Sequence, residues 1–314
     1  MIPGEAVGAD FGNKTVELRN GRRLAVDAVV IATGAAPHRP KGIDVASDVL
    51  LHHLHTADDA DALRQSMPLP EGRRVAVIGA GFSGTELASH YVSAGAEVVL
   101  VGRSATPLLG ALGAQLSPRL ADLQRTRTDA RLGVTVQAIT PSGGRTRLTL
   151  SDGSSTQVDA VILALGAAPA TGWAGAPDGI RVDNRLRTRQ EGWYAVGSAA
   201  YIASGTEKLR TDHWNAAVAQ GRHAARTILH DLLGAEDPGP YRPRTGFNLR
   251  AFGSTIAMRG LRCPDGSERE AAWPIEPPHP DAALVEFLSV DGEVTGVAGY
   301  NAGDAVLHAG SSIV

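Results

Sequence analysis

The apolar run Val75–Ile78 is followed by three glycines, Gly79, Gly81 and Gly84, and then by a segment with helical periodicity. This order of strand, Gly-x-Gly-x-x-Gly turn and helix binds the pyrophosphate of a dinucleotide. The first glycine allows the tight turn, the second lets the backbone approach the phosphates, and the third lets the helix pack on the strand. The helix N-terminus offers its free amides to the anion. Because Glu97–Val101 reads as the next strand, the context fits and we expect NADP or NAD to bind here.

The second strand of this unit ends in Gly102-Arg103. Many dinucleotide-binding units carry a carboxylate at this place, where it hydrogen-bonds the adenosine ribose and repels a 2′-phosphate. No carboxylate is available here, and the Arg103 guanidinium can pair with a 2′-phosphate instead. The sequence therefore favours NADP over NAD. The alternative is that Arg103 is a solvated surface side chain.

Composition excludes several classes of protein. The 314 residues are enough for two domains, or for one domain with appendages. Thirty Lys and Arg residues against 33 Asp and Glu residues give a net charge of −3, so there is no electrostatic case for nucleic acid or an anionic membrane as a partner. No apolar run reaches the roughly 18 residues of a membrane span, and nothing at the start reads as a signal peptide. We expect a soluble, cytoplasmic protein.

Neither cysteine nor histidine predicts a metal or disulfide centre. Cys263 is the only cysteine, so an intramolecular disulfide, a redox-active CxxC and a cysteine-based zinc cluster are all excluded. His52-His53-x-His55 invites a metal interpretation, but no fourth ligand follows at a recognisable spacing. We predict no metal site.

The elements that would position these residues alternate between strand and helix, which predicts an α/β fold. Asn20-Gly21 between Lys14–Leu18 and Arg22–Val26 is a hairpin signal, and Asp27–Ala32 reads as a buried strand. The other predicted elements are a linker entering a short helix over 51–67, a helix over 116–131, strands over 134–139, 145–150, 155–158, 160–165 and 192–197, a long helix over 211–233 capped by Thr211 or Asp212, and short β-stretches after residue 237.

Six ordered motifs run through the chain from residue 27 onward: VVIATGAAP, VAVIGAGFSGTELA, AVILALGAAP, GIRVDNRLRT, WYAVGSAA and DHWNAAVAQGRHAA. In this order the chain resembles the ferredoxin-reductase-like branch of the FAD and pyridine-nucleotide oxidoreductases. The resemblance implies a Rossmann-type NAD(P) domain inserted in an FAD-type domain, with a small C-terminal β-rich domain. The predicted segments are 1–50 as a remnant of the FAD-type domain, 51–170 as the NAD(P)-binding domain, 171–236 as the returning FAD-type segment and 237–314 as the β-rich domain.

The resemblance also implies roles for individual residues. On the nucleotide side, Phe82 covers the cofactor or packs in the protein, Glu86 caps its helix or lies near the nicotinamide, and Gly166 repeats the turn of the earlier ATGAAP motif. A flavin-type pocket would be lined by Thr33, Gly34, Pro37, Gly197, Ser198 and Trp214. In this pocket Asp212 and His213 offer acid and base capacity, so they are the candidate catalytic residues. The alternative for them is an ordinary capped helix.

Several departures from the family pattern predict that FAD is bound weakly or not at all. The 26 residues before Asp27 read as a hairpin, whereas a flavin-binding βαβ unit with its own glycine turn needs about 30. The late Gly-Asp motif of the family is Gly197-Ser198 here, and the aromatic-polar run beside the isoalloxazine is replaced by residues 247–252, FNLRAF. Without the phosphate loop, several charge-assisted hydrogen bonds of about 1.5–3 kcal/mol each are lost.

The same departures leave a sheet edge uncovered, and we expect a homodimer through this edge. A folded-back N-terminal hairpin or a separate polypeptide supplying the missing unit are the alternatives. We do not expect the ferredoxin partner of the family here, because electron transfer to a ferredoxin would pass through the FAD that this chain is predicted to bind weakly or not at all.

The sequence predicts two alternative functions. One is an NAD(P)H-binding oxidoreductase with impaired FAD binding that acts on a small molecule. The other is a repurposed non-redox catalyst or binding protein that uses the vacated flavin pocket. A third alternative is that the chain is one half of a flavoprotein that is split between two polypeptides.

Overall fold

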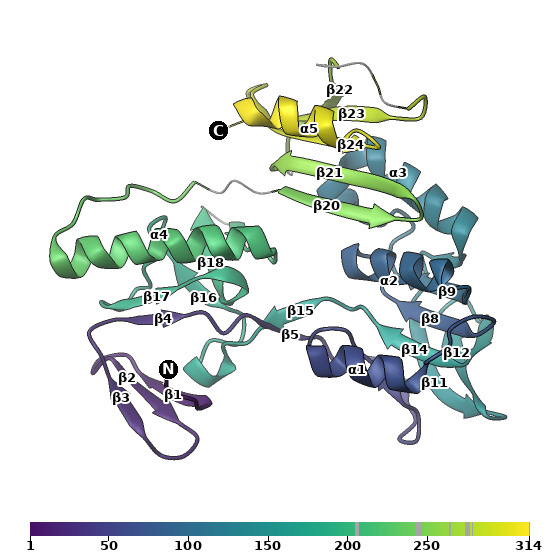
Figure 1. The fold of residues 1–314 in the computed structure, drawn as a ribbon, viewed down its shortest axis with the longest axis horizontal. Helices are drawn as coiled ribbons and strands as arrows, with labels where there is room; N and C mark the ends of the chain where they lie inside the picture. Colours follow the sequence, from purple (N-terminus) through teal and green to yellow (C-terminus); the bar gives the residue numbers. More distant parts are fainter. Residues whose placement is uncertain (205–206, 243–245, 264, 274–276, 278, 314) are drawn as a thin grey trace. The chain divides into compact units, whose positions relative to one another are not determined.

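The computed structural model describes residues 1–204, 207–242, 246–263, 265–273, 277 and 279–313. The chain forms two compact units, and each is built from two stretches of sequence. Unit 1 comprises residues 1–36 and 167–245, and unit 2 comprises residues 37–166 and 246–314. The α/β fold and the C-terminal β-rich region are confirmed (Figure 1). The chain passes between the units after residues 36, 166 and 245, whereas the boundaries predicted from the sequence lie after residues 50, 170 and 236.

Unit 2 contains a five-stranded sheet in the order β10-β9-β8-β14-β7, and every neighbouring pair in it is parallel. Its strands are β7 (Leu51–His52), β8 (Arg74–Ile78), β9 (Glu97–Gly102), β10 (Asp129–Leu132) and β14 (Ala160–Leu163). Its helices are α1 (Ala57–Ser66), α2 (Phe82–Ser93) and α3 (Leu109–Arg127). Val75, Ala76 and Val77 are fully buried, as expected for a central strand covered on both faces.

The helix predicted over residues 116–131 is shifted in the structure. It is α3, which begins at Leu109, contains a kink at Gly113 and ends at Arg127. Residues Asp129–Leu132 form β10 instead, because they pair in parallel with β9 at the edge of the sheet. A tertiary pairing therefore overrides the helical pattern at this end.

A second sheet of unit 2 has the order β13-β12-β11-β6, and a C-terminal sheet has the order β20-β21-β24-β23-β22. The bounds are β6 (Asp44–Val45), β11 (Val136–Ser142), β12 (Arg145–Leu150), β13 (Ser155–Val158), β20 (Gly246–Ala251), β21 (Ser254–Gly260), β22 (Ser267–Glu270), β23 (Ala283–Leu288), β24 (Val294–Tyr300), α5 (Gly303–Ala309) and the 3₁₀ turn η3 (Gly310–Ser312). Leu112, Leu116 and Leu120 of α3 pack in one core with Leu249 and Phe287 of the C-terminal sheet. The C-terminal sheet therefore shares a hydrophobic core with the helices of the parallel sheet.

Unit 1 is assembled from small sheets and one long helix. Its elements are β1 (Ala6–Asp10), β2 (Thr15–Leu18), β3 (Arg23–Ala25), β4 (Val29–Ile31), η1 (Gly172–Ala174), β16 (Ile180–Val182), β17 (Trp193–Ala195), η2 (Gly197–Ala199), β18 (Ala200–Ser204), β19 (Glu207–Leu209) and α4 (Trp214–Leu233). The predicted hairpin at Asn20-Gly21 is confirmed as the β2–β3 pair. Trp193 is fully buried, its ring centroid lies 4.5 Å from that of Phe11, and its indole N–H donates to the Phe11 carbonyl at 3.1 Å.

The prediction that Asp27–Ala32 is a buried strand is wrong in part. The strand is only β4, and Val30 at its centre is 42% exposed while Ile31 is buried. β4 pairs in parallel with β17 and, among the described residues, with no other strand. Because side chains alternate along a strand, Val30 points to the face opposite that of Ile31, and this face remains open to solvent.

The two Ala-Ala-Pro segments noted in the sequence lie next to each other. Residues Ala35–Pro37 form β5, residues Ala167–Pro169 form β15, and the two strands pair. Residues 36 and 166, after which the chain passes between the units, therefore lie in or directly beside this pair of strands.

The predicted start and cap of the long helix are also wrong. α4 begins at Trp214, and its N-cap is His213, whose Nδ1 accepts a hydrogen bond from the Asn215 amide at 3.2 Å. Asp212 does not cap the helix because its carboxylate accepts a 2.7 Å hydrogen bond from the Arg210 guanidinium. A competing ion pair thus removes the residue that local preference would select.

Candidate functional site

The three glycines of the Gly-x-Gly-x-x-Gly turn lie between β8 and α2, and each has a different structural reason. Gly79 has a φ of +117°, and a Cβ there would overlap the carbonyl oxygen of Ala164. A Cβ at Gly84 would overlap the carbonyl oxygen of Gly79, so this position lets α2 approach the turn. At Gly81 a Cβ would meet nothing within 4 Å. The fold itself requires Gly79 and Gly84, whereas Gly81 faces open space.

The N-terminus of α2 is free to bind an anion. Gly81 is the N-cap residue and makes no side-chain capping bond, so the amides of the first turn have no partner within the helix. The turn lies at the carboxyl end of β8, next to β14, where the strand order reverses. This is the place at which open parallel sheets bind nucleotides. The glycines, the free amides and the helix dipole therefore fit a pyrophosphate.

Two buried side chains that the sequence did not single out hold this turn. The hydroxyl of Thr85 donates to the Gly81 carbonyl at 2.7 Å, and the side-chain amide of Gln124 donates to the Thr85 oxygen at 2.8 Å. Both residues are fully buried. Because Gln124 comes from α3, this relay joins α3 to the phosphate turn.

Arg103 lies next to the same turn. A Cβ at Gly102 would come within 2.7 Å of the Ala80 side chain, so the end of β9 is packed against the glycine turn. Arg103 follows directly and is exposed. Its side chain forms no hydrogen bond or ion pair with any described residue, which leaves the guanidinium free for a ligand.

Phe82 and Glu86 on α2 face the C-terminal sheet. The Phe82 ring packs edge-on against Phe247 with centroids 4.6 Å apart. Glu86 does not cap α2, and its carboxylate lies 3.4 Å from the amide nitrogen of Arg250 on β20. The hydroxyl of Ser89 accepts a shorter hydrogen bond, 2.7 Å, from the amide of Phe252. The packing alternative for Phe82 is therefore realised, and the run over residues 247–252 contacts α2.

Gly166 follows β14 and belongs to the same edge of the parallel sheet. It has a φ of +82°, and its carbonyl accepts a hydrogen bond from the His38 amide at 2.9 Å. Ala164, two residues earlier, lies against both Gly79 and Gly84. Gly166 thus lies close in sequence to the residue that packs on the phosphate turn.

In unit 1 the residues expected to line a flavin-type pocket gather at one edge. Thr33 and Gly34 follow β4, and Gly197 and Ser198 follow β17, so both pairs lie beyond the carboxyl ends of two parallel strands. The Thr33 hydroxyl donates to the Ala170 carbonyl at 2.7 Å, and Pro37 lies in β5. The structure therefore brings Thr33, Gly34, Gly197 and Ser198 together in unit 1, whereas Pro37 belongs to unit 2 and Trp214 is 80% exposed at the start of α4.

Gly197 is also tied to α4 by a residue that the sequence did not indicate. Its amide donates to the side-chain oxygen of Gln220 at 2.7 Å, and Gln220 is buried. A Cβ at Gly197, which has a φ of +64°, would lie 3.3 Å from the Ala217 side chain. This contact fixes the first half of α4 over the turn after β17.

The candidate catalytic residues Asp212 and His213 do not form a pair with each other. Asp212 is bound by Arg210, and His213 uses Nδ1 to cap α4. No described hydrogen bond joins the two side chains. Their catalytic role remains a prediction.

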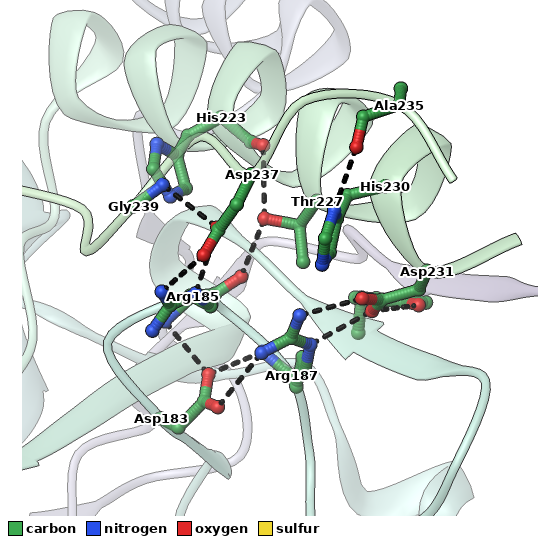
Figure 2. Close-up of polar contacts among 11 residues, drawn as sticks. Asp183, Arg185, Arg187, His223, Thr227, His230, Asp231, Ala235, Asp237 and Gly239 are labelled. Carbon is green, nitrogen blue, oxygen red and sulfur yellow. Dashed lines mark hydrogen bonds and ion pairs between the residues drawn. The ribbon is translucent and has the colours of Figure 1, made fainter. Parts of the chain in front are cut away.

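The second half of α4 is fastened by a network of acidic and basic side chains, shown in Figure 2. Arg187 donates to both oxygens of Asp231 at 2.8 and 2.6 Å, and the Tyr194 hydroxyl donates to Asp231 at 2.8 Å. Arg185 likewise donates two hydrogen bonds to the carboxylate of Asp237, at 3.1 and 2.6 Å. These contacts join the loop before β17 to the end of α4.

The network perturbs the protonation of its members. The hydrogen bonds from Arg187 hold the pKa of Asp231 below its usual value, against a smaller effect of burial. Burial, assisted by the neighbouring carboxylate, raises the pKa of Tyr194 to about 12. A cavity of about 530 Å³ lies beside this network, and it is lined by paired charges that include Lys14 and Glu191.

The described residues contain neither a cluster of metal ligands nor a helix that could span a membrane. No group of three or more His, Cys, Asp or Glu side chains in this part of the chain is arranged to hold a metal ion. His52 is buried in β7, and burial lowers its pKa. No described helix combines the length and the apolar composition needed to cross a bilayer.

Comparison with protein families gives one match over most of the chain. The model of the family described as pyridine nucleotide-disulphide oxidoreductase matches residues 1–221. This range contains the glycine turn of unit 2 and the carboxyl ends of β4 and β17 in unit 1.

Among individual relatives, a probable ferredoxin reductase from Castellaniella defragrans is 34% identical over 197 residues, which are 60% of this chain and 47% of the relative. This chain thus spans about half the length of that relative. The ferredoxin–NAD(+) reductase component of the p-cumate 2,3-dioxygenase system of Pseudomonas putida is 28% identical over 304 residues, or 95% of this chain and 71% of the relative. A crystal structure of the ferredoxin reductase for the CYP199A2 system of Rhodopseudomonas palustris matches with a TM-score of 0.82 and 25% identity, covering 96% of this chain and 73% of the other.

Proposed function

The chain belongs to the pyridine nucleotide-disulphide oxidoreductase family, and from this premise we propose that it is an oxidoreductase that binds NAD(P)H at the glycine turn of unit 2. The observation that carries the proposal is the difference between the three glycines. Gly79 and Gly84 are explained by the protein's own backbone, but the open space at Gly81 is not. A pyrophosphate that approaches the backbone there accounts for it.

We further propose that NADPH is preferred over NADH. Arg103 is exposed beside the turn, and it has no partner among the described side chains. A guanidinium can make two parallel hydrogen bonds to a phosphate, whereas the 2′-hydroxyl of NADH offers no charge to pair with.

When bound, the nicotinamide supplies a hydride, and the protein supplies binding and orientation. The protein's own contribution on this side is to hold the phosphates with the first amides of α2. The Thr85–Gln124 relay fixes the Gly81 carbonyl and so the direction of those amides.

We propose that this chain by itself does not retain FAD tightly. The sequence holds one Gly-x-Gly-x-x-Gly turn that follows a strand, and the dinucleotide above already occupies it. At the carboxyl edge of β4 and β17, the family's acidic residue is replaced by Ser198, whose hydroxyl cannot match a carboxylate as a charged acceptor. The residues present therefore offer polar groups without a second phosphate cradle.

For the electron acceptor we propose a small molecule. Phe247, in the segment that replaces the family's aromatic-polar run beside the isoalloxazine, packs against Phe82. The relatives named above are reductases of ferredoxin-dependent systems, so a ferredoxin is the acceptor against which this proposal is tested.

The test uses the purified chain without added cofactor. We expect no flavin absorption bands, and calorimetric titration should show one site that binds NADPH more tightly than NADH. Absence of binding for both nucleotides would refute the nucleotide site, and stoichiometric FAD in the preparation would refute the second proposal. NADPH consumption is then compared with a panel of small-molecule acceptors and with a ferredoxin, and turnover with ferredoxin alone would overturn the proposed acceptor.

A further inference from the structure

The long helix α4 has a buried face and, on its other side, an exposed apolar stripe. Its core face carries Ala216, Gln220, Ala224 and Thr227, which are all buried. The opposite face, half a turn away, carries an outer stripe at spacings of four and three residues. The outer stripe consists of Trp214, Val218, Gly221, Ala225, Leu229 and Leu232.

The outer stripe is exposed along its length. Trp214 is 80% exposed, Val218 38%, Leu229 48% and Leu232 44%. A helix that covers one side of a sheet normally turns charged or polar residues outward, and a helix that is apolar on both sides is normally covered on both. A continuous apolar stripe of this kind marks an interaction site.

The pattern within the stripe points to its occupant. Gly221 and Ala225 lie two residues on either side of position 223, and Trp214 and Leu232 lie nine residues on either side of it. Val218 and Leu229 lie five and six residues away. The stripe therefore has small residues at its centre and large ones at both ends, in an arrangement that is nearly unchanged when the helix direction is reversed.

We propose that the outer stripe of α4 binds the same stripe of a second copy of this chain, with the two helices antiparallel about a two-fold axis near residue 223. In this arrangement Gly221 of one copy faces Ala225 of the other, which allows close approach of the backbones. The large side chains at each end, Trp214 and Leu232, face each other. A self-complementary patch of this kind is what an isologous two-fold interface requires.

The charges beside the stripe predict how the dimer responds to salt. Arg222 is exposed next to the axis, so the two copies of Arg222 lie near each other in the dimer. No described residue of its own chain forms an ion pair with Arg222. Because salt screens like charges, we expect the dimer to become stronger as ionic strength rises.

The size of the contact sets its strength. A helix of 20 residues is about 30 Å long, and one such helix pair buries less than the roughly 800 Å² per partner of a standard interface. We therefore expect a monomer–dimer equilibrium that changes over micromolar protein concentrations. Sedimentation velocity of the full chain across a hundredfold range of concentration measures it.

The first test changes the stripe. Leu229→Glu should weaken dimerisation at least tenfold, and Val218→Lys should do the same. Leu69→Glu is the matched control, because Leu69 is 76% exposed but lies outside α4, and it should leave the equilibrium unchanged. Circular dichroism checks that each variant is folded. A wild-type chain that is monomeric at all concentrations, or a dimer that both stripe variants leave intact, would overturn the proposal.

The second test reports the direction of the helices. Cys263 is first replaced by serine, so that an introduced cysteine is unique. In the antiparallel pair the two copies of residue 225 are offset by about 6 Å along the axis and those of residue 232 by about 27 Å, from the helical rise of 1.5 Å. A short bifunctional thiol reagent should cross-link Ala225→Cys and not Leu232→Cys. Cross-linking of both would indicate parallel helices and refute the arrangement.

Discussion

Replacing Gly81 by alanine separates nucleotide binding from folding. Gly81 has φ −78° and ψ −163°, which alanine adopts without strain, and the added methyl group would meet no protein atom within 4 Å. Alanine at a compatible position gains about 0.4–1 kcal/mol through the unfolded state and loses up to about 1 kcal/mol as a poorer N-cap residue. We expect the free energy of unfolding of Gly81→Ala to stay within about 1 kcal/mol of wild type.

Binding of NADPH should change much more. The methyl group would occupy the space through which the pyrophosphate reaches the amides at the start of α2. Loss of one backbone hydrogen bond to a charged phosphate corresponds to about 1.5–3 kcal/mol. The dissociation constant for NADPH should therefore rise about 10- to 150-fold.

Two further alanine substitutions serve as comparisons. Gly84→Ala places a methyl group inside the contact distance of the Gly79 carbonyl oxygen, so it should lower the free energy of unfolding by about 1–3 kcal/mol or more. Gly110→Ala makes the same chemical change at a glycine of α3 where nothing lies within 4 Å, so it should leave NADPH binding unchanged and raise the free energy of unfolding by at most about 1 kcal/mol.

The assay combines calorimetric titration with NADPH and unfolding in denaturant for all three variants. The informative result is a Gly81→Ala protein that is as stable as wild type and binds NADPH weakly. If Gly81→Ala binds NADPH as wild type does, the phosphates do not approach the backbone at this residue and the assignment of the turn is wrong.

Three other predictions concern residues around the two sites. Arg103→Glu should weaken the binding of NADPH about tenfold or more relative to that of NADH, because a charge-assisted hydrogen bond is replaced by repulsion. Arg127→Glu, at an exposed arginine at the far end of α3, should leave the ratio of the two dissociation constants unchanged. An unchanged ratio in Arg103→Glu would show that Arg103 does not contact the 2′-phosphate. Thr85→Val keeps the side-chain shape but leaves the buried Gln124 amide without its acceptor, so unfolding free energy should fall by about 1–3 kcal/mol in denaturant titrations, and a loss near zero would show that the relay is not needed. Asp231→Asn should destabilise the protein at neutral pH by about 1–3 kcal/mol. Since the folded-state pKa of Asp231 is depressed, this stabilisation is present above its unfolded value and is lost as pH falls through the folded value. The difference between wild type and this variant should therefore shrink below about pH 4, and a difference that grows with acid would contradict the network.

Local pattern was sufficient for the features that a few consecutive residues specify. The glycine turn at residues 79–84 was predicted because the turn, the apolar strand before it and the helix after it are contiguous. The β2–β3 hairpin was predicted for the same reason, although the register shows a three-residue loop over residues 19–21, in which Gly21 has a φ of +82°. The α/β class followed from the alternation of such elements, and ordered motifs indicated the family.

Local pattern failed where a distant partner competed with it. Asp212 has the better capping side chain, but Arg210 binds it, so His213 caps α4. The helical pattern over residues 128–131 gives way to β10 because β9 offers a parallel partner there. Residues Val29–Ile31 are all apolar, as in a strand buried on both faces, but Val30 points to the face opposite that of Ile31 and is 42% exposed there.

The sequence by itself determined that a phosphate turn exists and which residues form it. Only the tertiary structure decided that Gly81 is the one glycine of this turn that faces open space, that Gln124 donates to Thr85 from 39 residues away, and that Arg187 binds Asp231 across 44 residues. Side chains so far apart in the chain are brought together by the packing of helices on sheets. No periodicity within either segment encodes that meeting, because each residue's partner lies on a different element.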